Sequence, residues 1–386
     1  MNARPLRIAM LAHSTNPRGG VVHALELADA LVALGHECVV HAPDPRGKGF
    51  FRRTVCETVS VAARPVGLGV RELVETRAAD YVSHFEDPLH RRFDVFHAQD
   101  GISANALATL KQRGLMAGFV RTVHHIDVFE DAVVAAMQRR SIVAADRHFV
   151  VSEMWRQKLA ADFGIEATIV GNGVDRRRYH PEPEGCETAL RERLGLGSGP
   201  IILAVGGVEE RKNTLRLLEA FAGLSLQHPG VQLVIAGGAS LLDHDCYQRR
   251  YALAKAERRL APTAVVETGL LPDADMPVLY RLADVLAFPS VKEGFGLVVL
   301  EAMASGVPVV TSRMAPFTEY LDNRDVEWCD PFDIGSIREA IDHALWAPHR
   351  AGLVERGAEV ARGHDWSRVA HAHLPVYQAV REPLDA

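Results

Sequence analysis

The chain has 386 residues, of which 48% are hydrophobic and 24% are charged, and a globular chain of this length is predicted to form two domains rather than one. Its formal net charge of −6 is divided unevenly: residues 1–178 contain 23 Lys and Arg against 20 Asp and Glu, and the rest contains 20 against 29. This is not the charge balance of a nucleic-acid-binding protein. No apolar run reaches the roughly 20 residues that a membrane-spanning helix needs.

The first half of the chain alternates strand-like and helix-like segments. Residues 6–14 show a short buried-strand pattern, and residues 19–34 repeat apolar side chains at steps of three and four, as a helix does, with Gly35 at the end. Further short runs rich in Val and Phe occupy residues 38–43, 93–100, 118–125 and 147–153. This alternation predicts βαβ units on a mostly parallel sheet.

The same pattern restarts after a linker. Residues 180–200 are rich in Pro, Gly and charge, as linkers are. Beyond them, strand-like runs alternate with helical segments at residues 201–207, 231–238, 264–271, 284–290 and 308–312. We therefore predict two doubly wound α/β domains, residues 1–178 and 179–365, with a ligand cleft between the carboxyl ends of the two sheets.

Two strand ends in the first half offer groups for a ligand. Gly19 and Gly20 open the first helix, where bare backbone amides and the helix dipole suit an anion, and a tight turn is the alternative. His124 and His125 follow another strand and could donate to a phosphate or a sugar hydroxyl. With 18 histidines in the chain, a packed or surface role is equally open for both.

In the second half, Arg211 and Lys212 lie where a strand gives way to a helix. Two cations at such a junction can neutralise a diphosphate, Arg through its forked donors and Lys as a point charge. The alternative is a solvated ion pair with the preceding Glu209 and Glu210.

The segment KEGFGLVVLEAMASG, residues 292–306, places Glu293 and Glu301 at the start and in the middle of an apolar helical stretch. The glycines on either side of Phe295 free the backbone, and a helix starting near Phe295 would point its amide donors at an anion. Glu301 would lie inside that helix, where a buried carboxylate needs donors. Vicinal sugar hydroxyls would supply two of them, and a salt bridge to a nearby Arg is the alternative.

Neither the acidic triplets nor the cysteines predict a metal site. The triplets Asp243–Asp245 and Asp273–Asp275 lie in loops that lead into helices, where Asp is a common N-cap. The five cysteines have no CxxC or CxxH spacing, which argues against zinc and disulfides and fits a reducing cytoplasm. We therefore expect no metal, no other cofactor and a cytoplasmic location.

Taken in order, these segments resemble the retaining GT-B glycosyltransferases of family 4. The strongest part is EGFGLVVLEAMASGVPVV, residues 293–310, with two glutamates separated by seven residues, and TVHHID, GNGVD and EERKN are similar to the family in the same order. The resemblance implies a GT-B fold of two Rossmann-like domains. Residues 1–178 would form the acceptor-side domain and residues 179–365 the donor domain, with a C-terminal helix, about 366–386, packing back on the first.

The resemblance also implies roles for individual residues. Glu293 would contact hydroxyls of the donor sugar, Glu301 would hold the ribose hydroxyls, and the two cations with the helix amides would hold the diphosphate. The implied catalytic residues are Glu293, His124, Arg211 and Lys212, and the implied donor-binding residues are Gly19, Gly20, Leu270, Leu271, Gly294, Phe295, Gly296, Leu297 and Glu301. The chain departs from the family at Gly207, where many members have Arg, and at residues 313–320, which lack the family's glycine pair.

The implied reaction is transfer of a sugar from a UDP-, GDP- or ADP-sugar to an unidentified sugar, lipid or small-molecule acceptor. Anomeric configuration would be retained through attack on the same face, assisted by the leaving phosphate, and the developing charge would be stabilised electrostatically. Such an enzyme is a hexosyltransferase of class EC 2.4. The alternatives are a GT-B phosphorylase or epimerase acting on sugar phosphates or nucleotide sugars, and an inactive nucleotide-sugar binding module.

One loop suggests a further contact. Residues 44–53, DPRGKGFFRR, combine four cations with two phenylalanines. Such a loop could meet an anionic acceptor or lipid headgroups, which would make the protein weakly peripheral to a membrane. An exposed loop with two anchoring aromatics is the alternative.

Overall fold

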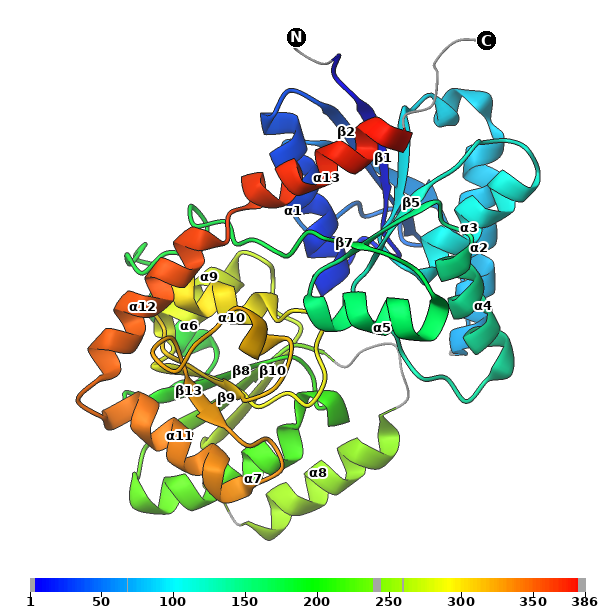
Figure 1. Cartoon of the computed structure of the whole chain (residues 1–386). Coiled ribbons are helices and arrows are strands. Elements are labelled where there is room, and N and C mark those ends of the chain that lie inside the picture. The colour runs from blue at the N-terminus through cyan, green and yellow to red at the C-terminus, as the bar shows by residue number, and fades with distance from the viewer. Residues whose placement is uncertain (1–3, 68, 239–243, 259, 381–386) are drawn as a thin grey trace. The chain divides into compact units, whose positions relative to one another are not determined.

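The computed structural model describes residues 4–67, 69–238, 244–258 and 260–380, and the chain divides into two compact units. Unit 1 comprises Met1–Asn172 and Trp366–Ala386, and unit 2 comprises Gly173–Asp365. Each unit has its own sheet (Figure 1). Among the described residues, no helix is both long enough and apolar enough to cross a membrane.

Unit 1 is built on a seven-stranded parallel sheet with the order β3-β2-β1-β4-β5-β6-β7. The inner strands β2, β1, β4, β5 and β6 are mostly buried because helices cover both faces of the sheet, whereas the edge strands β3 and β7 are largely exposed. The strands are β1 (Arg7–Leu11), β2 (Glu37–Asp44), β3 (Glu57–Ala62), β4 (Val95–Ala98), β5 (Val120–Val123), β6 (Arg147–Val150) and β7 (Thr168–Ile169).

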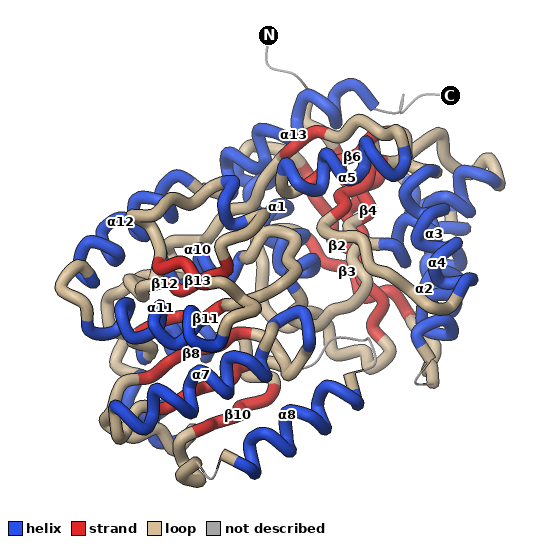
Figure 2. The backbone as a smooth tube through the Cα atoms, turned by 60° about the horizontal axis from the view of Figure 1, so that its bottom comes forward, coloured by secondary structure: helices blue, strands red, loops and turns tan. Residues whose placement is uncertain are grey.

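In unit 1, helices α2, α3 and α4 cover one face of the sheet, and α1 and α13 lie side by side on the other (Figures 1 and 2). The helices are α1 (Gly19–Ala33), α2 (Val70–Glu86), the 3₁₀ helix η1 (Pro88–Arg91), α3 (Gly101–Gln112), α4 (Ala132–Val143), α5 (Glu153–Phe163) and α13 (Trp366–Val380). The C-terminal α13 thus completes the core of unit 1, where its buried Tyr377 bonds to His97 of β4.

Unit 2 is built on a six-stranded parallel sheet with the order β10-β9-β8-β11-β12-β13. Its strands are β8 (Ile201–Val205), β9 (Gln232–Ala236), β10 (Val265–Gly269), β11 (Val285–Phe288), β12 (Val309–Ser312) and β13 (Glu327–Cys329). Two α/β units on parallel sheets confirm the fold class predicted from the alternating apolar runs.

Helices cover both faces of the unit 2 sheet as well, with α7, α8 and α11 on one face and α6, α9, α10 and α12 on the other (Figures 1 and 2). Their bounds are α6 (Glu187–Arg193), η2 (Glu210–Lys212), α7 (Thr214–Gln227), α8 (Asp245–Glu257), α9 (Asp275–Leu282), α10 (Leu297–Ala304), η3 (Phe317–Glu319), α11 (Ile334–Trp346) and α12 (Arg350–Gly363). Between the sheet and α7 and α11 lies a core of fully buried side chains that includes Phe221, Val285 and Ile341.

The strand order reverses once in each sheet. In unit 2 the chain runs outward from β8 through β9 to β10, then returns to β11 beside β8 and runs outward in the opposite direction. In unit 1 the same reversal occurs between β1 and β4. Open α/β sheets bind ligands at the carboxyl ends of the strands that flank such a reversal, so the loops that follow these strands are where functional groups are expected.

Candidate functional site

The loops after β8 and β11 of unit 2 meet at the reversal in strand order. Val291 donates its backbone N–H to the carbonyl oxygen of Arg211 at 2.8 Å. This bond joins the loop that carries the two cations to the loop that carries Glu293. The sequence pattern places both loops after strands, and the pairing of β8 with β11 is what brings them together.

Glu293 is buried and is the acceptor at the centre of this site. Lys212 donates from Nζ to Glu293 Oε1 at 2.7 Å, and Arg211 donates from Nη1 to the same oxygen at 3.3 Å. Burial by itself would raise the pKa of Glu293, but the charges of Lys212 and Arg211 outweigh it and hold that pKa below its ordinary value. Glu293 is therefore an ionised carboxylate between two cations.

The cations are themselves held in place. Arg211 also donates from Nε to Glu209 Oε2 at 2.9 Å, so the ion pair considered as an alternative from the sequence coexists with the contact to Glu293. The ammonium of Lys212 lies 4.4 Å from the centroid of the Phe288 ring, a cation–π distance. Burial lowers the pKa of Lys212, against the opposing effect of the Glu293 charge.

Asn213 fixes the turn that presents these cations, although no pattern in the sequence marks it out. Its φ of 58° puts a non-glycine residue in the left-handed region, which is uncommon and needs support from the surroundings. The support comes from its buried side chain, whose Nδ2 donates to the carbonyl oxygens of Pro289 at 3.1 Å and Pro331 at 2.6 Å.

The segment that opens α10 is shaped by Gly296. Its φ is 97°, and a Cβ at this position would lie 2.7 Å from Cε1 of Phe317, so any other residue would be strained and would require the Phe317 ring to shift. The helix begins at Leu297, two residues later than the start near Phe295 expected from the sequence, because the left-handed Gly296 interrupts the helical backbone. The Phe295 ring is buried and stacks on Tyr320 with centroids 4.5 Å apart.

Glu301 lies on the second turn of α10 and is partly buried. Its Oε2 accepts a hydrogen bond of 2.7 Å from the hydroxyl of Tyr280, which belongs to α9. Leu270 and Leu271 follow β10, and the side chain of Leu270 is 61% exposed. Leu270 also packs over Gly238, where a Cβ would approach Leu270 Cγ to 3.1 Å.

In unit 1, Gly20 and one histidine singled out from the sequence come together, whereas a Cβ at Gly19 would meet nothing within 4 Å among the described residues. A Cβ at Gly20 would lie 3.8 Å from Nε2 of His124, so the first turn of α1 passes close to that ring. His124 Nε2 bonds to Gln99 Oε1 at 3.0 Å, and burial holds the His124 pKa well below its ordinary value. His125, by contrast, is exposed and lies 3.0 Å from Asp127.

In the second acidic triplet, both carboxylates pair with arginines. Asp273 pairs with Arg178 at 2.6 Å, and Asp275 pairs with Arg193. Asp245 is the first residue of α8, and Asp243 lies outside the described residues. Within the described ranges, no group of three or more His, Cys, Asp or Glu side chains is arranged to hold a metal ion.

The basic aromatic loop at residues 44–53 is partly tied down. Arg52 pairs with Glu26 at 2.7 Å and lies over the Phe51 ring, and the backbone N–H of Phe51 donates to the carbonyl oxygen of Thr15 at 3.1 Å. The exposed cations of the loop are Arg46, Lys48 and Arg53.

Comparison with protein families gives two matches that together cover most of the chain. Residues 187–360, most of unit 2, match the model of "Glycosyl transferases group 1". Residues 17–178, most of unit 1, match the model of "Glycosyltransferase Family 4".

Among characterised proteins, the chain is 30% identical over 356 residues to the GDP-mannose-dependent α-(1-6)-phosphatidylinositol monomannoside mannosyltransferase of Mycolicibacterium smegmatis, covering 87% of this chain and 88% of that protein. It is 26% identical over 391 residues to a glycogen synthase of Mycobacterium tuberculosis, covering 93% and 90%.

Solved structures share the whole fold. Sucrose-phosphate synthase of Thermosynechococcus elongatus matches with a TM-score of 0.79 at 21% identity, over 97% of this chain and 99% of that one. HepE of Anabaena, solved with UDP and glucose, matches with a TM-score of 0.77 at 16% identity, over 97% and 100%. At these identities the likeness concerns the fold alone.

Proposed function

Because the chain belongs to the group 1 and family 4 glycosyltransferases of the GT-B fold, we propose that it transfers a hexose from a nucleoside diphosphate hexose to an acceptor with retention of anomeric configuration. Its relatives are glycosyltransferases of class EC 2.4, and so is this enzyme. The observation that carries the proposal is the ionised Glu293 held by Lys212 and Arg211 at the reversal in strand order.

The two cations and the start of α10 suit the leaving group. Breaking the anomeric bond leaves negative charge on the diphosphate, and electrostatic stabilisation of that charge is usually the largest catalytic contribution. Arg211 and Lys212 would supply fixed positive charge, and the first amides of α10 from Leu297 would add donors without an intrahelical acceptor. This arrangement would stabilise the diphosphate without a metal ion.

Glu293 is proposed to act on the sugar and Glu301 on the ribose. The sugar becomes positively charged as the anomeric bond breaks, and the Glu293 carboxylate would accept hydrogen bonds from sugar hydroxyls beside that carbon. Retention would follow from attack on the same face, with the leaving phosphate accepting the proton of the acceptor hydroxyl. Gly294, Phe295 and Gly296 would contribute backbone contacts to the donor.

The remaining donor contacts are proposed from the family resemblance. In unit 2, the backbone after β10 at Leu270 and Leu271 is proposed to contact the base. In unit 1, His124 is proposed to contact the donor sugar, and Gly19 and Gly20 are proposed to approach the diphosphate.

Relatives suggest which donors to test first. One relative is named as dependent on GDP-mannose, and structures of Anabaena HepE contain UDP with glucose and UDP-glucose. We therefore propose a hexose on GDP or UDP, with ADP as the third base to test. The acceptor would be a sugar, a lipid headgroup or a small molecule.

The test is release of nucleoside diphosphate from UDP-, GDP- and ADP-hexoses, followed by a search for an acceptor that accelerates it. We expect one donor to be turned over, the activity to survive EDTA, and the product to keep the anomeric configuration of the donor. A stable glycosyl adduct on Glu293 would overturn the same-face mechanism. Phosphate-dependent release of free sugar phosphate would instead identify a phosphorylase.

The membrane contact of the loop at residues 44–53 is a separate proposal. It rests on the exposed Arg46, Lys48 and Arg53 beside two partly buried phenylalanines. Sedimentation with vesicles that contain phosphatidylglycerol should pull down the wild type at low salt and the triple Ala variant much less. Wild-type protein that stays in the supernatant would refute the contact.

A further inference from the structure

The partner of Glu301 is a buried tyrosine on a neighbouring helix. Helices α9 and α10 lie side by side on the same face of the unit 2 sheet (Figure 1). The side chain of Tyr280 is fully buried, and its hydroxyl donates to Oε2 of Glu301 at 2.7 Å. Since a hydrogen bond to an ionised acceptor is stronger than one between neutral groups, this contact restricts the orientation of the carboxylate.

The ring of Tyr280 is itself fixed. Tyr179 packs against it edge to face, with centroids 5.7 Å apart at 80°. Arg178 lies over the Tyr179 ring and pairs with Asp273, two residues before α9, at 2.6 Å. This chain of contacts leaves the Tyr280 hydroxyl little freedom to swing away from Glu301.

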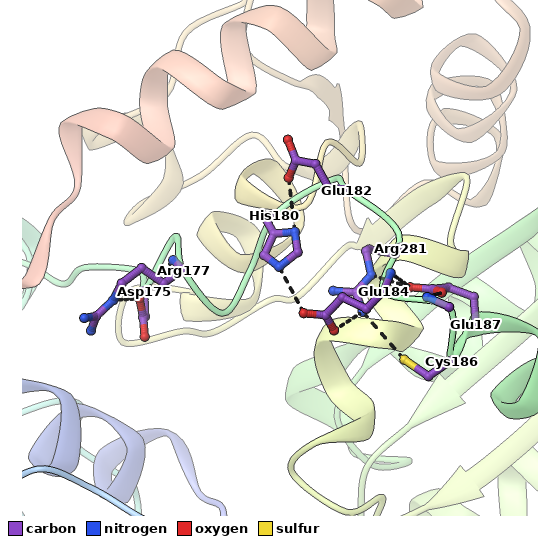
Figure 3. Close-up of polar contacts among 9 residues, drawn as sticks. Asp175, Arg177, His180, Glu182, Glu184, Cys186, Glu187 and Arg281 are labelled. Carbon is purple, nitrogen blue, oxygen red and sulfur yellow. Dashed lines mark hydrogen bonds and ion pairs between the residues drawn. The ribbon is translucent and has the colours of Figure 1, made fainter.

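The residue after Tyr280 anchors the helix that carries it. The side chain of Arg281 is only 2% exposed and bonds through Nε to Glu187 and through Nη2 to Glu184, both at 2.7 Å. Figure 3 shows the Arg281 guanidinium between these two glutamates, with His180 on the far side of Glu184. Helix α9 is therefore tied to residues 184–187 as well as to α10.

The chemistry of the pair keeps the tyrosine as the donor. Burial and the nearby carboxylate of Glu301 raise the pKa of Tyr280 well above its ordinary value, so the hydroxyl retains its proton. A carboxylate can accept about four hydrogen bonds, so the bond from Tyr280 is compatible with further bonds from two vicinal hydroxyls.

We infer that Tyr280 is a positioning residue that orients the Glu301 carboxylate for the ribose 2′- and 3′-hydroxyls, and thereby sets the preference for ribonucleotides over deoxyribonucleotides. This inference rests on the proposed function, in which Glu301 holds the ribose. Tyr280, which lies outside the Glu293–Glu301 segment, would thus control the preference of the donor site for ribonucleotides.

The test is equilibrium binding to wild type and Tyr280→Phe, using whichever of UDP, GDP and ADP binds wild type most tightly, with its 2′-deoxy and 3′-deoxy counterparts. Wild type should bind the deoxy compounds roughly 10- to 100-fold more weakly, the range expected for loss of a hydrogen bond to a charged group. Tyr280→Phe should weaken ribonucleotide binding by about 5- to 20-fold and leave deoxynucleotide binding nearly unchanged, so that the preference collapses.

A matched control exists in the same unit. Tyr251 is buried on α8, and its hydroxyl donates to Oε1 of Glu267 at 3.2 Å. Tyr251→Phe therefore removes a similar bond away from α10, and it should leave the preference at its wild-type value. In a Glu301→Ala background, Tyr280→Phe should have no further effect on either class of nucleotide.

The outcomes separate this inference from the proposed function. If wild type binds none of the three nucleotides, the proposed function fails. If wild type prefers the ribonucleotide and Tyr280→Phe keeps that preference, the positioning role of Tyr280 is refuted and the proposed function stands. Glu301→Asp is a second test in case Tyr280→Phe misfolds. The shorter side chain withdraws the carboxylate from an intact Tyr280. If Glu301→Asp keeps the wild-type preference for ribonucleotides, the inference is also refuted.

Discussion

Lys212 and Glu293, 81 residues apart in the chain, are joined by a hydrogen bond of 2.7 Å from Nζ to Oε1. The contact exists because β8 and β11 are neighbours at the reversal in strand order of unit 2, so the loops that follow them leave the sheet side by side. The charge of Lys212 helps to hold the pKa of Glu293 below its ordinary value. The contact also gives the proposed reaction a carboxylate and a basic side chain at fixed positions.

The first prediction concerns the charge on Glu293. Glu293→Gln keeps the size and shape of the side chain and removes the negative charge that is proposed to act beside the anomeric carbon. We expect turnover to fall by about 100-fold or more, as when one preorganised electrostatic contact is lost, while the nucleotide dissociation constant changes only a few-fold. Steady-state kinetics and calorimetric titration measure the two quantities, and Glu267→Gln is the control. A large loss of affinity with retained turnover would contradict the assignment.

The second prediction concerns Lys212. Lys212→Met removes a charged partner of a buried carboxylate, and breaking a buried ion pair on one side costs about 3 kcal/mol or more of stability. The variant should also bind nucleoside diphosphate more weakly while its affinity for the nucleoside stays the same.

Lys255→Met is the matched control for that variant. Lys255 pairs with Glu267 at 2.6 Å, but both side chains are well exposed, and exposed pairs contribute about 1 kcal/mol or less. Thermal unfolding should therefore separate the two variants clearly. Equal losses in both would show that the Lys212–Glu293 pair behaves as a surface pair.

The fold was predictable because parallel strands buried on both faces leave a clear signal. Residues 201–205 and 285–288 are continuous apolar runs, and both are strands of unit 2. Glu293 was also recognisable as part of the candidate site, since it follows such a run and precedes glycines. Glu293 and Lys212 are paired because of the strand order of the sheet. That order cannot be read from the residues of either loop alone.

Other parts of the candidate site could not be predicted from the sequence, and the physical reason can be given for each. Tyr280 lies on the apolar face of α9 among residues that pack the core, so its spacing is that of a core residue and gives no sign of its hydroxyl contact to Glu301. The role of Asn213 could be predicted only if its left-handed φ were known. The late start of α10 depends on the left-handed φ of Gly296, which the sequence does not reveal. These features arise from contacts between distant segments.

The third prediction separates two reasons why position 296 favours glycine, namely its positive φ and the close approach of a neighbouring ring. Its φ of 97° favours glycine, and a Cβ there would also meet the Phe317 ring at 2.7 Å. Gly230 has nearly the same φ, 93°, and a Cβ added to it would meet nothing within 4 Å among the described residues. Gly230→Ala should therefore cost about 1 kcal/mol for backbone strain alone, whereas Gly296→Ala should cost about 1–3 kcal/mol more because of the collision. Thermal unfolding compares them, and equal costs would mean that Phe317 yields freely.

The fourth prediction concerns buried histidines in the core of unit 1. His373 of α13 packs on Phe149 with ring centroids 4.3 Å apart, and His23 of α1 bonds through Nδ1 to Asn172 at 2.6 Å. Burial lowers the pKa of His23 to about 4 and that of His373 to about 3. Unfolded histidines take up protons near pH 6.5, so between pH 6.5 and about 4 the unfolded state binds more protons and is favoured.

Unit 1 should therefore have its full stability above about pH 6.5 and lose it progressively on acidification, with His23 alone accounting for about 3 kcal/mol by pH 4. Thermal unfolding followed from pH 7.5 to 4.5 measures this slope. His373→Phe removes one of the titrating rings and should flatten the slope. His371→Phe, on the same helix but exposed in folded and unfolded protein alike, should not. If His373→Phe leaves the slope intact, the acid sensitivity of unit 1 does not come from His373 in this cluster.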